Sequence, residues 1–304
     1  MSKQAQFITP FLWFDGKAEE AAELYTSLFP NSRIKTISRY GKKGFVQHGQ
    51  PEGLATVVVM ELDGYQISGH NGGPIFKPTP ALSFFVQLET EELVDKVWAG
   101  LLNGGSVMMP LEAQEWSPKF GWLNDRYGIS WQITLGPKAD VRQTISPALL
   151  FVGEKHGKAE AALEHYTRIF PNSSVDNVLK YDGSGIEPEG TITNAQFYLN
   201  GETFMVMDGA GEHPFDFNEA FSLNISCETQ DEIDAYWNGL LENGGEPGPC
   251  GWLKDAFGVS WQIVPSTMGQ LMTDTRPGVS GRVMEAMLKM TKIDKAALEA
   301  AAEA

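Results

Sequence analysis

The chain contains one long sequence motif twice, and this internal repeat constrains its fold more than any other feature. Residues 121–133 read GWLNDRYGISWQI and residues 251–263 read GWLKDAFGVSWQI, so nine of the thirteen positions are identical, both tryptophans included. Shorter matches occur in the same order in both halves: ITPFLWF (8–14) with ISPALLF (145–151), FPNS (29–32 and 170–173), LDG (62–64) with LNG (199–201), and NGG (103–105 and 243–245). Self-similarity over a whole half predicts two copies of one fold.

The hydrophobic pattern predicts one order of elements four times: a strand, a helix and then three strands. In the first half we expect strands at residues 8–14, 33–40, 54–62, 65–71, 82–88, 106–109, 121–125 and 129–135, and helices at 17–28 and 91–102. In the second half we expect strands at 145–152, 174–181, 191–199, 202–208 and 221–227, a hairpin at 251–264, and helices at 158–169 and 230–241. The predicted fold class is α+β, with four βαβββ units and a helical tail over about 281–304.

The length of the chain, 304 residues, fits two ordinary domains. Gly136-Pro137 stops the last strand of the first half, so the boundary is expected between residues 136 and 144. We therefore expect a first module at residues 1–136, a second at 145–265 and a C-terminal helical tail at 266–304. Two such modules in one chain form a pseudo-dimer, and a homodimer of the whole chain is also conceivable from the sequence.

The net charge excludes a nucleic-acid partner, because 39 acidic against 23 basic residues give −16 and no basic run with interleaved aromatics offsets it. No stretch approaches the eighteen or so apolar residues of a membrane helix, and residues 1–7 lack a basic region followed by an apolar one. We expect a cytoplasmic protein with no membrane partner. The two cysteines, Cys227 and Cys250, are expected as reduced thiols, with Cys227 in the core.

Three groups of residues carry a resemblance to a known family: the opening from Phe11 to Tyr25 with LFP at 28–30, GHNGGP at 69–74 after the LDG hairpin, and the repeated tryptophan motif. They resemble the vicinal oxygen chelate superfamily, which includes glyoxalases, bleomycin resistance proteins and dihydroxybiphenyl dioxygenases. Within it they resemble the PhnB-like family, also called the 3-demethylubiquinone-9 3-methyltransferase family. The resemblance implies two tandem modules whose sheets form open β-barrel cups. It also implies a small molecule bound or converted inside a cup, in several members with a divalent metal.

The positions that hold this metal in metal-dependent members can be matched to the chain by the same resemblance. They correspond to Thr9, Ser68, Ser83 and Gln132 in the first half and to Ser146, Met205, Ser222 and Gln262 in the second. Hydroxyls and amides are weak ligands beside imidazole or carboxylate. We therefore predict no tightly bound metal and no cofactor.

Strand alternation predicts which side chains face the cups, because every second residue of a strand points to the same side. In the last strand of the first half, for example, Trp131 and Ile133 are expected to face the helices, and Gln132 the cup. The predicted ligand-binding residues are Thr9, Phe11, Trp13, Gln66, Ser68, Ser83, Phe85, Gln87, Gln132, Asn224 and Gln262. This mixture of hydroxyls, amides and aromatics is typical of sites for a neutral or mildly polar organic ligand.

His70 is the one predicted catalytic residue, because an imidazole titrates near neutral pH and lies beside Ser68 on a polar strand face. A hydrogen-bonded rim histidine without a chemical role is the alternative. His156 and His165 are expected on the solvated surface, and His48 and His213 in loops. The repeated tryptophans 122, 131, 252 and 261 are attributed to hairpin and helix packing rather than to ligand stacking. The segment 111–120, absent from the second half, is interpreted as a flap over one cup or as an ordinary surface loop.

Three functional hypotheses follow, and the sequence leaves open whether the chain is an enzyme. The favoured one is a metal-free protein that captures a small organic molecule in a cup. The second is a metal-dependent lyase, isomerase or dioxygenase with His70 and either Glu61 or Asp208 among its ligands. The third is an interaction protein with vestigial cups. A methyltransferase is disfavoured, because no Gly-x-Gly-x-x-Gly turn follows a predicted strand, as S-adenosylmethionine enzymes of the common type require.

The sequence also leaves open which units share a cup. If units one and four pair, His70 and Trp13 lie in one cup with Asn224 and Gln262. If they do not, the neighbours of His70 and Trp13 are Ser83 and Gln132.

Overall fold

The computed structural model describes residues 6–41, 49–138 and 141–304. Residues 1–5, which belong to the predicted first module, and His48 lie outside the described residues. Across those three ranges, no helix combines the length and the apolar character needed to cross a membrane.

The first half contains two βαβββ units, as the hydrophobic pattern predicts. Unit 1 consists of β1 (Ile8–Phe14), α1 (Ala18–Leu28), β2 (Arg33–Arg39), β3 (Ala55–Leu62) and β4 (Tyr65–Asn71). Unit 2 consists of β5 (Leu82–Leu88), α3 (Glu91–Leu102), β6 (Ser106–Gln114), β7 (Ser117–Asn124) and β8 (Ser130–Leu135). Asp63 and Gly64 both have positive φ angles, of 45° and 83°, which is the backbone of a tight hairpin turn.

The second half repeats this arrangement and ends in three helices. Unit 3 consists of β9 (Ile145–Phe151), the short helix η2 (Gly153–Lys155), α4 (Ala159–Ile169), β10 (Ser174–Lys180), β11 (Ile192–Leu199) and β12 (Glu202–Asp208). Unit 4 consists of β13 (Phe221–Cys227), α5 (Gln230–Leu241), β14 (Glu246–Pro247), β15 (Trp252–Lys254) and β16 (Ser260–Pro265). The tail contains α6 (Met268–Met272), α7 (Val279–Met287) and α8 (Lys295–Glu303), so it is helical from a point earlier than residue 281.

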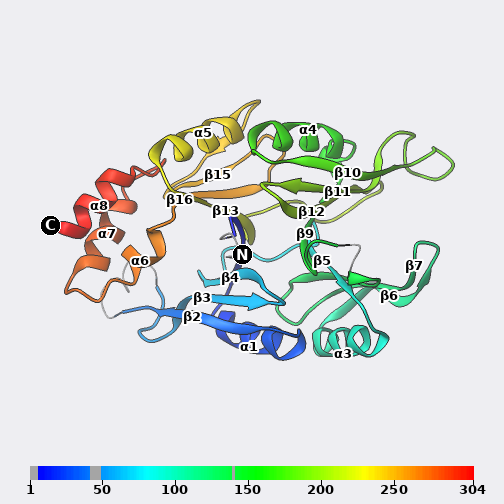
Figure 1. The fold of residues 1–304 in the computed structure, drawn as a ribbon, viewed down its shortest axis with the longest axis horizontal. Coiled ribbons are helices and arrows are strands. Elements are labelled where there is room, and N and C mark those ends of the chain that lie inside the picture. The colour runs from blue at the N-terminus through cyan, green and yellow to red at the C-terminus, as the bar shows by residue number, and fades with distance from the viewer. Residues whose placement is uncertain (1–5, 42–48, 139–140) are drawn as a thin grey trace.

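Each of the two sheets combines one unit from each half of the chain. Sheet A has the strand order β14-β15-β16-β13-β1-β4-β3-β2 and joins units 1 and 4. Sheet B has the order β10-β11-β12-β9-β5-β8-β7-β6 and joins units 3 and 2. The two tandem modules thus form a pseudo-dimer within one chain, in which units one and four share a sheet. The helices α1 and α3 lie along one outer side and α4 and α5 along the other, with the tail helices at one end (Figure 1).

The concave faces of the two sheets, here called cup A and cup B, are defined by strand register. In sheet A, Phe11 lies opposite both Ser68 and Ser222, so the three side chains share one face. The alternate positions, such as Ile8 and Leu12, are fully buried against the helices. The Phe11 and Trp252 rings approach to 6.4 Å although two strands separate β1 from β15, as expected for a curled sheet that remains open.

A buried aspartate explains the repeated tryptophan motif. Asp125 accepts hydrogen bonds from the Trp131 indole N–H (3.0 Å) and the Tyr25 hydroxyl (2.6 Å), and from the backbone N–H groups of Tyr127 and Ile129. Burial is the largest influence on its carboxyl and raises the pKa, against the lowering effect of these bonds. The motif therefore specifies a closed hairpin turn and a fixed tryptophan together.

The second half contains the same network at Asp255. Its carboxylate accepts from the Tyr166 hydroxyl (2.7 Å) and the Trp261 indole N–H (2.8 Å), and from the backbone of Phe257 and Val259. In each case the tyrosine comes from a helix over one sheet and the aspartate from a hairpin of the other. The two networks therefore attach sheet A to sheet B.

Two expectations about local structure are corrected here. The segment 111–120 is not an ordinary surface loop, because it extends β6 and β7 into a longer hairpin that carries Trp116, 68% exposed, near its turn. His165 is not on the solvated surface but only 5% exposed, since the face of α4 that carries it packs on Phe257. Cys227, by contrast, is fully buried, as expected.

A second buried carboxylate, Glu202, joins the start of β12 in sheet B to the start of β1 in sheet A. Its Oε1 accepts hydrogen bonds from the backbone N–H groups of Phe7 (2.5 Å) and Ile8 (3.0 Å). Its Oε2 is buried and has no hydrogen-bond partner among the described residues. Burial raises the pKa of Glu202 from 4.5 to about 7.

Replacing Asp255 by alanine should strongly destabilise the protein. The variant leaves a buried hydroxyl, an indole N–H and two backbone N–H groups without acceptors, which costs on the order of 3 kcal/mol or more. Urea unfolding measures the loss, and Asp125→Ala should match it because its network is the same. The control Asp15→Ala, at an exposed turn, should change the free energy of unfolding by less than about 0.5 kcal/mol. An equally small change for Asp255→Ala would refute this account.

Glu202 should make the protein less stable as pH rises. Because its folded pKa lies above the unfolded value, the native state binds the proton more tightly. Its contribution is fully present below pH 4.5 and is lost as pH rises to about 7, a change of about 3 kcal/mol at 1.36 kcal/mol per pKa unit. Glu202→Gln should remove this component of the urea-unfolding pH profile, whereas the exposed Glu164→Gln should retain it. A Glu202→Gln profile parallel to wild type would contradict the assignment.

Candidate functional site

The structure distributes the predicted site residues over two cups. Strand register places Thr9, Phe11, Trp13, Gln66, Ser68, His70, Asn224 and Gln262 on the concave face of sheet A. It places Ser83, Phe85, Gln87 and Gln132 on that of sheet B. His70 and Trp13 therefore share a cup with Asn224 and Gln262, the first of the two pairings considered from the sequence.

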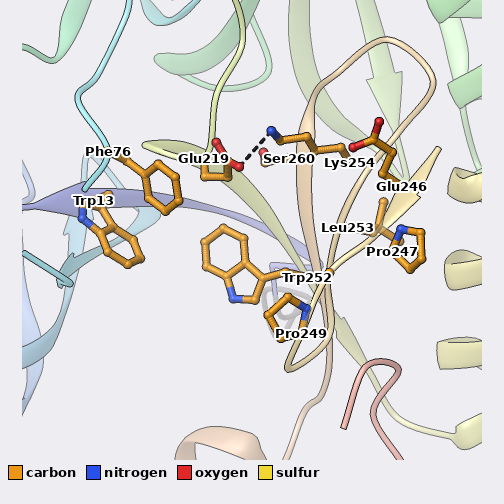
Figure 2. Close-up of a pocket in the computed structure, with 11 residues that line it drawn as sticks. Trp13, Phe76, Glu219, Glu246, Pro247, Pro249, Trp252, Leu253, Lys254 and Ser260 are labelled. Atoms are coloured by element: carbon orange, nitrogen blue, oxygen red, sulfur yellow. Dashed lines mark ion pairs between the residues drawn. The ribbon is translucent and has the colours of Figure 1, made fainter. Parts of the chain in front are cut away.

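Cup A contains a cavity of about 390 Å³ against the wall formed by unit 4. Its lining residues are Trp13, Phe76, Glu219, Glu246, Pro247, Gly248, Pro249, Trp252, Leu253, Lys254 and Ser260. In Figure 2, Trp252 lies at the centre, with Trp13 and Phe76 on one side and Pro247 and Leu253 on the other. Among the predicted residues Trp13 lines this cavity, and Phe11 and His70 lie behind it, in ring contact with Trp252 and Trp13 respectively.

Trp13 is held in a fixed orientation at the edge of the cavity. Its indole N–H donates to the carbonyl of Gly73 at 2.7 Å, and the Phe76 ring meets it edge-on at 5.0 Å. The ring lies directly over Gly72, where a Cβ would come within 2.0 Å of it. Gly72 is therefore required for the close approach of the indole, in addition to ending its strand.

The internal repeat allows the tryptophan of one cup to be compared with its counterpart in the other. In cup B, the Trp122 indole N–H donates to the hydroxyl of Ser130 at 2.7 Å and so covers that part of the sheet. In cup A the equivalent hydroxyl, Ser260, is 1% exposed and has no hydrogen-bond partner among the described residues. Trp252 does not make the equivalent bond and lines the cavity. The same pair of residues is thus bonded in cup B and not bonded in cup A, where Trp252 lines the cavity.

The C-terminal tail supports the turn that borders the cavity. The backbone N–H groups of Cys250 and Gly251 donate to the carbonyls of Met290 and Thr291, both at 2.7 Å. Both donors have positive φ angles, so this turn has a backbone that few residues other than glycine adopt readily. The tail therefore contributes to the shape of cup A, on the side of Pro249.

The rim of the cavity carries two carboxylates and one ammonium group. Lys254 forms an ion pair with Glu219 at 2.8 Å, drawn as a dashed line in Figure 2. Glu246 lies opposite Lys254 in the pairing of β14 with β15. Three formal charges therefore sum to −1 beside a wall of aromatic rings.

His70 lies within the aromatic layer behind the cavity. Its Nδ1 is 2.9 Å from the carbonyl of Thr56, and because a carbonyl only accepts, the proton is assigned to Nδ1. Burial lowers the pKa of His70 below 6.5, more than this hydrogen bond raises it. The imidazole is therefore neutral at physiological pH, with Nε2 as a proton acceptor.

The residues at the family's metal positions do not fit a tightly held metal. On cup A they are Thr9, Ser68, Ser222 and Gln262, and on cup B Ser83, Gln132, Ser146 and Met205. The amide nitrogens of Gln262 and Gln132 each donate to a serine hydroxyl at 2.9 Å, so these polar groups satisfy one another. In the described part of the chain, no group of three His, Cys, Asp or Glu side chains is placed to hold a metal.

The other candidate ligands of the metal-dependent hypothesis are not near His70. Glu61 pairs with Arg33 and lies opposite Gln66, four residues along β3 from the partner of His70, or roughly 13 Å. Asp208 belongs to sheet B, where its carboxylate accepts from the backbone N–H groups of Gly157 and Ile192. These bonds give Asp208 a structural role.

Sequence reasoning attributed Trp252 to packing and did not include Phe76, Glu219 or Lys254 among the site residues. For Trp252 and Lys254 a signal was available, because they alternate with the buried Leu253 and so face the cup. Phe76 and Glu219 come from loops, where no alternation applies. The two loops are joined by hydrogen bonds such as that from the Asn218 side chain to the Lys77 carbonyl.

Comparison with known proteins assigns the fold and a family. The model of a family described as 3-demethylubiquinone-9 3-methyltransferase matches residues 6–134 and again 143–264. No curated protein matches the chain. A PhnB protein from Bacillus cereus is 45% identical over 43% of this chain and all of its own, with a TM-score of 0.40. Glyoxalase I from Zea mays is 10% identical over 88% of this chain and 98% of its own, with a TM-score of 0.57. The likeness to glyoxalase I confirms the expected vicinal oxygen chelate fold.

The His70 imidazole should titrate below its ordinary pKa of 6.5, because burial disfavours the charged form. NMR of the histidine Cε1 proton measures this, with the resonance assigned from a His70→Gln variant. The same group should make the protein less stable as pH falls below 6.5, since the unfolded state then binds the proton more readily. His70→Gln should reduce that loss. A midpoint above 6.5 would show that the ring lies in water or beside an anion.

Proposed function

The chain belongs to the family described as 3-demethylubiquinone-9 3-methyltransferase, and we propose that it binds a small organic molecule in cup A without a tightly bound metal. The observation that carries the proposal is the cavity beside Trp252, about 390 Å³ in volume, with the unpartnered Ser260 hydroxyl in its wall. A concave, largely apolar space with a few polar groups is the usual form of a small-molecule site.

The buried Ser260 hydroxyl supports a ligand in this position. An unpaired buried hydroxyl costs free energy, on the order of 1–3 kcal/mol, and a bound molecule that pairs with it recovers part of that cost. In cup B the equivalent hydroxyl is already paired with Trp122. We therefore assign binding to cup A. The role of cup B is to complete the pseudo-dimer.

The alternative is a metal-dependent enzyme of the glyoxalase or dioxygenase type. It would need His70 together with other strong ligands, yet aromatic rings and the carbonyl of Thr56 surround this imidazole. Metal analysis of the purified protein tests the alternative. A stoichiometric transition metal that is lost in His70→Gln would favour it over metal-free binding.

A methyltransferase activity, which the family name suggests, finds no support in the residues. Enzymes of the common type bind S-adenosylmethionine at a glycine-rich turn of a parallel α/β sheet. Both sheets of this chain are mixed, and the helices α1, α3, α4 and α5 cover their outer faces. The proposed ligand is accordingly an organic molecule that fits between indole rings, in a cytoplasmic protein with two free thiols.

Tryptophol, a neutral indole alcohol, should bind to cup A and raise the melting temperature, because a ligand that binds only the native state stabilises it. Titration calorimetry measures its affinity. In Trp252→Ala the affinity should fall about tenfold, since losing roughly 50 Å² of apolar contact costs on the order of 1.4 kcal/mol.

The matched control is Trp122→Ala, the same substitution at the equivalent position of cup B. It should leave the tryptophol affinity within twofold of wild type, because Trp122 is bonded to Ser130 and lies in the other sheet. An affinity that falls in Trp122→Ala and not in Trp252→Ala would move the site to cup B. If tryptophol does not bind the wild-type protein, the proposal of an open site in cup A loses its support.

A further inference from the structure

The wall of the cavity in cup A has the electrostatic character of an aromatic box. Three of its lining side chains, Trp13, Phe76 and Trp252, present aromatic rings, and Trp13 meets the other two nearly edge-on at 5.0 and 6.5 Å. An aromatic face carries partial negative charge, which attracts cations and repels anions, and indole is the strongest of the natural rings in this respect.

The charged groups at the rim favour the same sign of ligand. Lys254 is the one cation among the residues that line the cavity, and Glu219 already neutralises it at 2.8 Å. Glu246 then leaves one carboxylate in excess. An anionic ligand would have to displace Glu219 from Lys254, whereas a cation meets Glu246 directly. The net charge of −16 of the whole chain acts in the same direction over longer range.

The Ser260 hydroxyl is a further polar group beside the cavity. It is 99% buried, belongs to a residue that lines the cavity and has no partner among the described residues, and it can donate as well as accept a hydrogen bond. A ligand with N–H groups can donate hydrogen bonds both to the Ser260 oxygen and to the carboxylates at the rim. An ammonium ion has several such donors, and its hydrogen bonds to charged acceptors are stronger than neutral ones.

The other cations of this region do not line the cavity: Lys77 follows Phe76 along the chain and is exposed, and Lys35 donates to the Gln66 side chain at 2.7 Å. His70, the titratable group behind Trp13, has its Nδ1 proton directed at the carbonyl of Thr56. Arg33, on the far strand of the sheet, is paired with Glu61 at 3.4 Å. Among the residues that line the cavity, the carboxylates therefore exceed the ammonium groups by one.

We propose that cup A selects an organic ammonium ion with a flat aromatic or similarly apolar body, held against the rings of Trp13, Phe76 and Trp252 and beside the rim carboxylates. The inference rests on the proposed function, since it names the class of molecule that the same site takes. It distinguishes this cavity from cup B, where the tryptophan and serine bond to each other.

Three indole derivatives of similar size and different charge test the proposal at pH 8: tryptamine, which is mainly cationic there, tryptophol, which is neutral, and indole-3-propionate, which is anionic. Titration calorimetry of the full chain should give an affinity for tryptamine about tenfold higher than for tryptophol, with indole-3-propionate weaker than both. Added salt should weaken tryptamine binding and leave tryptophol nearly unchanged, because only the charged ligand is screened.

The double variant Glu219→Gln/Glu246→Gln should lower the tryptamine affinity about tenfold, leave tryptophol within twofold, and strengthen indole-3-propionate because Lys254 loses its partner. The control Glu23→Gln/Glu164→Gln removes the same charge from exposed positions on α1 and α4 and should alter none of the three affinities by more than twofold. Melting temperatures of both double variants show whether they fold as wild type does.

The outcomes separate the two proposals. If tryptophol binds as tightly as tryptamine or more tightly, and neither compound binds Trp252→Ala, the preference for a cation is overturned and the site stays in cup A. Unchanged tryptamine affinity in Glu219→Gln/Glu246→Gln would likewise overturn it. If none of the three indoles binds, the proposed function itself fails.

Discussion

The structure depends on a buried aspartate that occurs twice. Asp125 and Asp255 each bind a tryptophan of their own hairpin and a tyrosine of a helix that covers the other sheet. Each carboxylate has four hydrogen-bond donors, which offset the large cost of burying a charge. Since each sheet is built from both halves, and these networks connect the two sheets, neither half is complete without the other. The repeated motif therefore supplies the contacts that join the two sheets.

This shared scaffold supports two unequal cups. The same tryptophan and serine occur in both, but in cup B they bond to each other and in cup A they are apart. What differs is the surroundings: Trp13 and Phe76 approach Trp252, and the tail holds the adjacent turn through Cys250 and Gly251. The two halves thus share one frame, and their cups differ in the surroundings of this tryptophan.

Most of the fold was predictable from the sequence, and only part of the site. Alternation and the repeat located most strands and helices to within a few residues and placed Trp131 and Trp261 in the core, because burial on one face imposes a period that the sequence displays. The exceptions are the β6–β7 hairpin, which is longer than expected, and the tail, which becomes helical at Met268. Register across non-adjacent strands is not encoded in any local pattern, so the pairing of units 1 and 4 needed coordinates. Phe76 and Glu219 lie in loops, where buried and exposed residues do not alternate regularly. His165 was expected at the surface because the sequence does not reveal its contact with Phe257. Trp252 was assigned to packing because it recurs as Trp122 in the same sequence context, and the difference between the two lies in their surroundings and in the missing bond to Ser260.

The central claim is that one of two duplicated cups is open, and NMR of the indole N–H groups tests it most directly. The chain contains eight tryptophans, whose indole signals in ¹⁵N-labelled protein can be assigned from single Trp→Phe variants. On addition of tryptamine, the account predicts shifts of the Trp252 and Trp13 signals and an unchanged Trp122 signal. A shift of Trp122 with Trp252 unchanged would contradict it.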